Sequence, residues 1–199
     1  MIEVPRLNLE PNDLRVVSPL FFDETHAKLP TSPKQLDIRV MEVKQACRLN
    51  GYWHSRFPQI DWSNVVRNKH YVCFSAEFDN VYYAVAIWST PIAANRLTDG
   101  MNKLELRRMA IADDAPKNTA TRMLKIMRQW IASNFHDVVG LISYQDTEVH
   151  FGTIYKADNW VLANTTNGLT DWTNRQRNKP QSVAEKIRWE YDLKKMRGR

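Results

Sequence analysis

Residues that could bind an anion gather where a predicted strand meets the clearest predicted helix. Asn118, Thr119, Ala120 and Thr121 form the start of that helix, directly after a strand-like run. The N–H groups and the dipole of a helix start attract anions, and the two threonine hydroxyls add donors. We therefore predict that this turn binds the phosphate of a cofactor or group donor. The alternative is that Asn118 or Thr119 only caps the helix.

A cation and a carboxylate lie on the predicted strands before and after this helix. Arg108 precedes the helix, and the planar guanidinium of an arginine suits a carboxylate or a phosphate. Asp146 follows it, at the end of a strand that also carries Ser143, and ligand sites of open α/β sheets gather at such strand ends. Asp146 could accept a proton from an amine, ligate a metal or cap the next helix, and the residue types leave these roles open. We group Ser143 with the cofactor-binding residues.

Two histidines and a tyrosine complete the candidates for chemistry. His54 follows a helix stop at Gly51, whereas His150 and Tyr155 belong to a predicted helix after Asp146. Histidine titrates near neutrality and ligates metals, and Tyr155 could donate to a reaction intermediate or be a plain aromatic of the helix face. His54, Asp146 and His150 together could form a two-histidine, one-carboxylate metal site, although their spacing does not require one.

These residues are carried by alternating strands and helices. Two β-rich runs, Tyr71–Phe78 and Val81–Trp88, flank the hairpin signal Asp79-Asn80. The second run is apolar at every position, which predicts a strand covered on both faces. The further predicted elements are a helix at 38–49, a strand at 104–111, a helix at 119–134, a strand at 138–142, a helix at 150–157 and a strand at 160–163. This order predicts an α/β (α+β) fold with a mixed central sheet flanked by helices.

The positive charge is concentrated at the carboxyl-terminal end. The formal net charge is +6, and residues 174–199 hold nine Lys or Arg against three acidic residues. A basic appendage on a neutral domain indicates a polyanion partner, and Pro180 opens a predicted basic helix there; a solvated helix that only aids solubility is the alternative. We predict one domain over 1–173, with an extended amino-terminal arm, and a basic tail over 174–199. The expected DNA contacts are Arg175, Arg177, Lys179, Lys186, Arg188, Lys194 and Lys195.

The remaining composition is typical of a cytoplasmic protein. No run approaches the ~20 apolar residues that span a bilayer, and the first residues lack the layout of a secretory signal. The two cysteines, Cys47 and Cys73, are too few for a disulfide scaffold or a zinc cluster, so we expect both to be core residues. The sequence does not fix the oligomeric state, and a homodimer is compatible with it.

Four motifs in order give the chain a resemblance to a known family. They are Leu104 to Arg108, Pro116 to Thr121, Leu141 to Asp146, and His150 to Ala157 closing on Trp160, with a weaker echo at Tyr52-Trp53-His54. Together they resemble the core of the Mom family of phage DNA-modification proteins, over about residues 100–165. The resemblance implies a fold similar to that of the N-acetyltransferases.

The resemblance also implies an activity. Members of the family convert adenine in DNA to an N6-carbamoylmethyl derivative, which protects phage DNA from restriction endonucleases. The implied partner is double-stranded DNA in the cytoplasm of a bacterial host, and the target base must leave its pair and stack on aromatic side chains. The candidates for stacking are Tyr52, Trp53, Tyr144 and Trp160. The implied reaction centre consists of His54, Arg108, Thr121, Asp146 and Tyr155.

The group donor stays open at this point. Ordinary N-acetyltransferases carry a glycine-containing loop over the pyrophosphate of coenzyme A, whereas this chain has no glycine between Gly100 and Gly140. Acetyl-CoA is therefore one donor among others. A carbamoylmethyl group joins N6 through a methylene carbon, which simple attack on a thioester carbonyl does not produce, and iron is one source of the extra activation. Two other functions also fit: an N-acetyltransferase for a protein or small amine, and a non-catalytic DNA-binding antirestriction protein.

Overall fold

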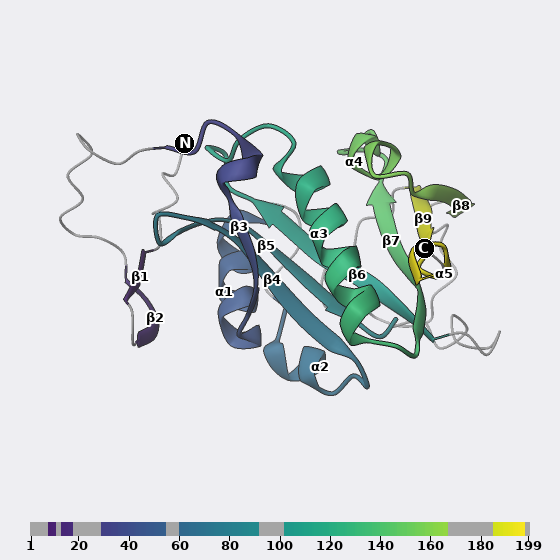
Figure 1. Ribbon diagram of the computed structural model, residues 1–199, viewed down its shortest axis with the longest axis horizontal. Helices are drawn as coiled ribbons and strands as arrows, with labels where there is room; N and C mark the ends of the chain where they lie inside the picture. Colours follow the sequence, from purple (N-terminus) through teal and green to yellow (C-terminus); the bar gives the residue numbers. More distant parts are fainter. Residues whose placement is uncertain are drawn as a thin grey trace, which may run out of the picture. The chain divides into compact units, whose positions relative to one another are not determined.

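Strands and helices alternate along the part of the chain that the computed structural model describes, residues 8–10, 13–17, 29–54, 60–91, 102–166 and 185–197. The chain forms two units. Unit 1 consists of Met1–Thr90 and Arg107–Met127, and unit 2 consists of Pro91–Leu106 and Arg128–Arg199. Strand β6 (Asn102–Ile111) and helix α3 (Thr119–Asn134) each contribute residues to both units. Both elements are labelled in Figure 1.

An antiparallel sheet is the framework of unit 1. Strand β4 (Tyr71–Phe78) pairs with β3 (Asp37–Met41) on one side and with β5 (Val81–Ser89) on the other. Asp79 and Asn80 join β4 to β5 with φ values of 50° and 60°, as a type I′ hairpin turn requires. The predicted hairpin is confirmed. The shorter elements of unit 1 are β1 (Asn8–Glu10), β2 (Asp13–Val17), a 3-10 helix (Pro33–Gln35) and α2 (Trp62–Val66).

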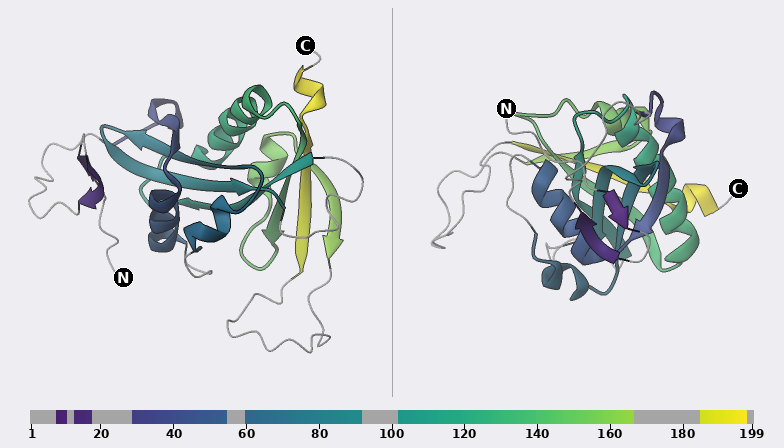
Figure 2. Two further views of the ribbon diagram at one scale, coloured as in Figure 1. Left: turned by 90° about the horizontal axis from the view of Figure 1, so that it is seen from below. Right: turned by 90° about the vertical axis from the view of Figure 1, so that its left-hand side faces the viewer.

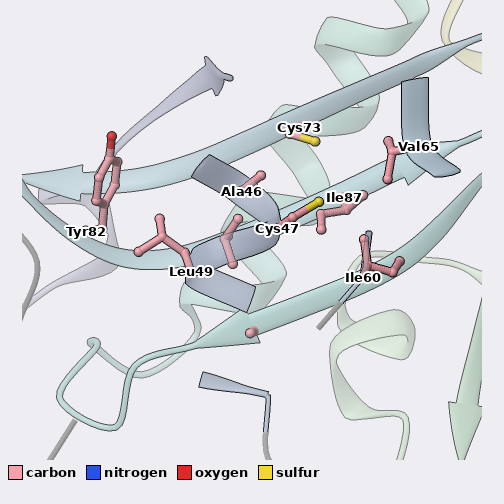
Figure 3. Close-up of a cluster of buried hydrophobic side chains, with 10 residues drawn as sticks. Ala46, Cys47, Leu49, Ile60, Val65, Cys73, Tyr82 and Ile87 are labelled. Atoms are coloured by element: carbon pink, nitrogen blue, oxygen red, sulfur yellow. The ribbon is translucent and has the colours of Figure 1, made fainter. Parts of the chain in front are cut away.

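Helix α1 (Val43–Trp53) packs against β4 and β5 and closes the core of unit 1. Figure 3 shows its Ala46, Cys47 and Leu49 facing Cys73 and Ile87 of the two strands in one apolar cluster. The register of the β4–β5 pair shifts between Ala76 and Glu77. This β-bulge reverses the alternation of side chains along β5, so the ring of Tyr82 belongs to the same cluster as the other residues. Both cysteines are therefore core residues, as expected.

Strand β5 is covered on both faces. All of its residues are buried, and Val85 and Ile87 belong to the cluster under α1. Trp88 belongs to a different contact, because its indole Nε1 donates to the Met127 sulfur of α3 at 3.1 Å. The prediction of a strand covered on both faces is confirmed.

A mixed sheet is the framework of unit 2. The first half of β6 runs parallel to β7 (Val138–Asp146), whereas β9 (Lys186–Asp192) lies antiparallel between β7 and β8 (Val161–Thr166). Helix α4 (Thr153–Ala157) connects β7 to β8, and α5 (Lys194–Arg197) follows β9 (Figure 2). The predicted α/β class with a mixed sheet is confirmed, as is the helix at 119–134. No helix among the described residues is long and apolar enough to cross a membrane.

Three predicted helices are wrong in part. The helix predicted at 150–157 begins only at Thr153, so His150 lies before it. Ile38–Met41 form a strand, and α1 begins only at Val43 because the carboxylate of Glu42 accepts from the N–H of Gln45 at 2.9 Å and caps the helix there. The predicted basic helix after Pro180 is instead strand β9 over 186–192, followed by the short helix α5. Hydrogen bonding to two neighbouring strands satisfies the β9 backbone, which favours the strand over a helix. The boundary after residue 173 stays a prediction, and 174–184 lie outside the described residues.

Candidate active site around Tyr155

Tyr155 lies at the centre of a buried aromatic group in unit 2. Helix α4 carries it, and its ring stacks on Trp189 of β9, with centroids 5.4 Å apart and planes at 16°. The edge of Trp160 meets the same ring at 5.6 Å and 66°. All three rings are buried. The packing fixes the phenol ring in one orientation, which is what a proton-transferring group requires.

The Tyr155 hydroxyl has a defined polar partner. Its oxygen lies 2.8 Å from Oγ of Ser143, a buried residue of β7. Burial raises the pKa of Tyr155 above its ordinary value, and the hydrogen bond to Ser143 opposes that rise. The side chain is therefore a neutral phenol at physiological pH. A neutral phenol in a dry site can donate a hydrogen bond or a proton to a group that gains negative charge during a reaction.

Gln145 connects the aromatic group to the loop that precedes α4. Its Oε1 accepts from Nε1 of Trp189 at 2.8 Å, and its Nε2 donates to the carbonyl oxygen of His150. Gln145 itself is buried, and its bond to Trp189 forms away from water, which strengthens it. The Gln145 amide therefore holds two parts of the structure in place: the Trp189 ring on which Tyr155 stacks, and the loop that precedes the helix of Tyr155.

Gly152 allows α4 to begin so close to the sheet. It takes the N-cap position with φ +69°, in the left-handed region, which favours glycine. A Cβ at this position would overlap Oε1 of Gln145 and lie 2.7 Å from Cζ2 of Trp189. Residue 152 therefore has to be a glycine if Tyr155 is to reach Ser143.

A buried ion pair supports the opposite side of the aromatic group. Nε and Nη2 of Arg128 lie 2.9 and 3.1 Å from the two carboxylate oxygens of Asp158. Asp158 also accepts from Nε1 of Trp160 at 3.0 Å, and the Arg128 guanidinium lies 4.6 Å from the ring centroid of Tyr191. The pair holds Trp160 against Tyr155. Only 12% of the Arg128 side chain is exposed.

Asp146 and His150 shape the loop between β7 and α4. Asp146 is buried, its Oδ1 accepts from the N–H of Glu148 at 3.1 Å, and its carbonyl accepts from the N–H of His150 at 3.1 Å. The side chain of His150 is exposed. These bonds hold the turn that follows β7. The N-cap of α4 is Gly152, which has no side-chain cap, so Asp146 does not cap that helix. A role as base stays a prediction.

The predicted metal set draws on both units, since His54 belongs to unit 1 and Asp146 and His150 to unit 2. Among the residues that the structure describes, no three side chains of His, Cys, Asp or Glu gather as metal ligands would. His54 caps the carboxyl-terminal end of α1, where its N–H donates to the Asn50 carbonyl at 2.9 Å. Asp146 and His150 are held in the loop before α4. The interpretation of His54, Asp146 and His150 as an iron site is therefore not supported.

Unit 1 carries the predicted anion site at the start of α3. Asn118 adopts φ +67° immediately before the helix, which asparagine tolerates better than most residues. This residue provides the left-handed turn that a glycine would otherwise supply. Thr119 is buried, and its hydroxyl donates to the Pro116 carbonyl at 2.7 Å, so it serves the turn. The N–H groups of the first helical turn, including Ala120 and Thr121, point out of the helix end.

Arg108 and the carboxyl-terminal cations have mixed surroundings. Nη1 of Arg108 donates to the Arg107 carbonyl at 2.7 Å within unit 1, and the side chain is half-buried. In unit 2, Arg188 pairs with Glu190 at 3.0 Å. Lys194 and Lys195 line a groove of about 770 Å³. Lys186 is described on β9, whereas Arg175, Arg177 and Lys179 lie outside the described residues.

Sequence reasoning named Tyr155 and Ser143 but missed the residues that hold them in place. Gln145 and Gly152 lie within two of the four motifs but have no predicted role, and Asp158 lies outside them. The roles of all three depend on tertiary contacts. The alternation of Ile187, Trp189 and Tyr191 is a signal that could have indicated strand β9, but these residues belong to the predicted basic helix.

Comparison with known proteins identifies a family for the sequence and solved structures that share its fold. The model of the Mom protein family matches residues 59–197. No curated protein shows significant similarity to the sequence.

Several solved structures share the fold. An N-acetyltransferase from Staphylococcus aureus Mu50 superposes with a TM-score of 0.57 at 10% identity, covering 79% of this chain and 97% of its own. The ribosomal-protein-S18-alanine N-acetyltransferase of Escherichia coli gives 0.53 at 14% identity, with coverages of 79% and 94%. Spermidine N-acetyltransferase from Vibrio cholerae, in complex with CoA and spermine, gives 0.58 at 11% identity, with coverages of 81% and 98%. At these identities the likeness establishes the fold alone.

Proposed function

Because the chain belongs to the Mom protein family, we propose that it is a transferase that attaches a small group to N6 of adenine in DNA. The group expected from the family is carbamoylmethyl, and the product would protect phage DNA from restriction. One structural observation supports an enzyme rather than a passive binding protein: the buried Tyr155–Ser143 pair, which a DNA-binding role does not require.

The proposed reaction requires that one proton be removed from the N6 amine and one be delivered to the leaving group. A bond forms between N6 and the carbon of the donor, the amine loses a proton, and the leaving group departs with its electron pair. Tyr155 delivers the proton to the leaving group, since it is a neutral phenol with a fixed ring. Asp146 is the proposed proton acceptor and Arg108 the proposed partner of an anionic group on the donor.

A donor that carries phosphate would fit the start of α3. Asn118 provides the left-handed turn without a glycine, so the missing glycine loop does not exclude a phosphate there. The backbone N–H groups of Ala120 and Thr121 would hold the phosphate. A coenzyme A thioester would supply only an acyl carbon, as in acetyl transfer. Attachment of a carbamoylmethyl group instead requires a donor whose methylene carbon carries the leaving group, and we propose a phosphate-bearing donor of that class.

The test is mass spectrometry of nucleosides from bacterial DNA after expression of the full chain. A new deoxyadenosine adduct is expected, and its mass identifies the transferred group. Tyr155→Phe removes only the hydroxyl, and we expect the rate of adduct formation to fall by about 10²-fold or more. Unmodified DNA with a folded, soluble protein would reject the proposal and favour a binding protein.

The fold supports a second candidate, an N-acetyltransferase acting on a protein or small amine. The observation in its favour is the likeness to N-acetyltransferases over most of the chain. It predicts binding of CoA, measurable by calorimetry, and acetylation of an amine without any change in DNA. Acetyl transfer to a polyamine together with unmodified nucleosides would favour this candidate.

A further inference from the structure

One face of helix α1 presents a continuous row of two cations and an aromatic ring. Lys44, Arg48 and Tyr52 lie four residues apart and are all exposed, whereas Ala46, Cys47 and the other inward residues belong to the core of unit 1. Residues with this spacing share one side of a helix. The row spans about 12 Å along the helix axis.

Helix α2 adds a second exposed ring beside this row. Trp62 begins α2, and Nζ of Lys44 lies 4.6 Å from the centroid of its ring. The exposed fractions of Trp62 and Tyr52 are 43% and 48%. Figures 1 and 3 show α1 and α2 against the same part of unit 1. Lys44, Arg48, Tyr52 and Trp62 are called the aromatic–cationic face below.

The cations of this face are available to an anionic partner. Among the described residues, no carboxylate forms an ion pair with Lys44 or Arg48. The two nearby acids are occupied as helix caps: Glu42 accepts from the N–H of Gln45, and Asp61 from the N–H of Ser63 at 2.9 Å. The hydrogen bonds that the Asp61 carboxylate accepts from the backbone and the side chain of Ser63 also lower the pKa of Asp61.

We propose that the aromatic–cationic face binds an unpaired stretch of a DNA strand. Lys44 and Arg48 would contact phosphates, and bases would stack on Tyr52 and Trp62, the combination by which proteins hold single strands. A duplex keeps its base faces inside the stack, so exposed rings favour a strand that has been opened. The inference rests on the proposed function, because removal of an adenine from its pair opens the strand around it.

The test measures the affinity of the full chain for a labelled single-stranded oligonucleotide by fluorescence anisotropy. We expect Trp62→Ala to weaken single-strand binding by about 5- to 100-fold, the range of one stacked base, and to affect a duplex of the same sequence much less. The exposed ring of Tyr71 lies on β4, outside this face, so Tyr71→Ala is the matched control and should bind as the unaltered chain does.

A salt series separates phosphate contacts from stacking. Lys44→Ala with Arg48→Ala should reduce the slope of log affinity against log salt by about 1.4, because each phosphate contact on a single strand contributes ~0.7. Trp62→Ala should leave the slope unchanged. Lys34, an exposed cation outside the face, gives the control Lys34→Ala, which should not change the slope.

Three results would overturn the inference: no single-strand binding by the unaltered chain, equal affinity of Trp62→Ala, or an unchanged slope in the double variant. Equal affinity of the variants would instead favour a protein partner for this face. Tyr52→Ala repeats the stacking test on the last turn of α1 if Trp62→Ala does not fold. Nucleoside mass spectrometry on the same samples reports the proposed function separately, since a chain that modifies adenine but binds equally well without Trp62 contradicts only the inference.

Discussion

At the scale of single residues, the position of the Tyr155 hydroxyl depends on side chains that do no chemistry. Gln145 bonds to Trp189 and to the loop before α4, and Gly152 lets that loop turn beside them. Any change in this group moves the phenol away from Ser143. The geometry of the candidate site is therefore decided by packing as much as by the two hydroxyls.

Gly152→Ala tests this dependence. The left-handed φ and the overlap with Gln145 and Trp189 should lower the free energy of unfolding by about 2–4 kcal/mol, and activity should fall with it. Denaturant unfolding measures the first effect. Gly140→Ala is the control, because a Cβ there would meet its nearest atom, the Tyr191 carbonyl, at an ordinary 3.5 Å. Equal effects at the two glycines would contradict the role of Gly152.

At the scale of elements, removing one partner of a buried ion pair should cost much more stability than removing one partner of an exposed ion pair. Asp158→Ala leaves the Arg128 guanidinium buried without its carboxylate, which should cost about 3–5 kcal/mol of stability. Arg39→Ala breaks a pair with Asp37 whose side chains are 65% and 68% exposed, and should cost less than about 1 kcal/mol. Thermal unfolding of both variants checks the difference. A small effect of Asp158→Ala would show that Trp160 holds its place without the ion pair.

The packing of α1 on the sheet gives stability a dependence on alkaline pH. Burial raises the pKa of Cys47 from 9.0 to about 11, with smaller contributions from Glu42 and Asp61. The unfolded chain ionises this thiol first, so the contribution of Cys47 to stability is fully present below pH 9 and is lost as the pH rises toward 11. Cys47→Ala should flatten part of that fall in denaturant titrations. A fall that begins well below pH 9 would contradict this origin.

At the scale of the whole molecule, the carboxyl-terminal segment is part of the fold and a source of charge. Strand β9 lies between β7 and β8, and its Trp189 stacks on Tyr155. The segment therefore cannot be removed to isolate its role in DNA binding.

Truncation after residue 173 should abolish folding of unit 2, which loss of soluble protein and of circular dichroism would show. Substitution of Arg175, Arg177 and Lys179 by alanine should instead leave the fold intact. If all three contact phosphates of double-stranded DNA, the salt slope of binding should fall by about 2.7. A folded truncated protein with normal activity would contradict the role given to β9.

Local patterns were sufficient for the elements whose residues decide their own structure. Asp79-Asn80 predicted the hairpin, the 3.6-residue stripe predicted α3 over Thr119–Asn134, and the unbroken apolar run predicted that β5 is covered on both faces. The four motifs predicted the family, which the family match over residues 59–197 confirms. Each of these signals lies within a short stretch of chain.

Only the tertiary structure decided β9 and the candidate site. Residues 186–192 combine charges with alternating aromatics. The hydrogen bonds of two neighbouring strands, whose paired residues lie 20 to 52 positions away along the chain, make them a strand rather than a helix. The contact between β7 and α4 brings Ser143 to Tyr155. The sequence by itself determined which chemical groups are present and the local form of most elements. Which groups meet depends on contacts between distant segments, and no local pattern encodes those contacts.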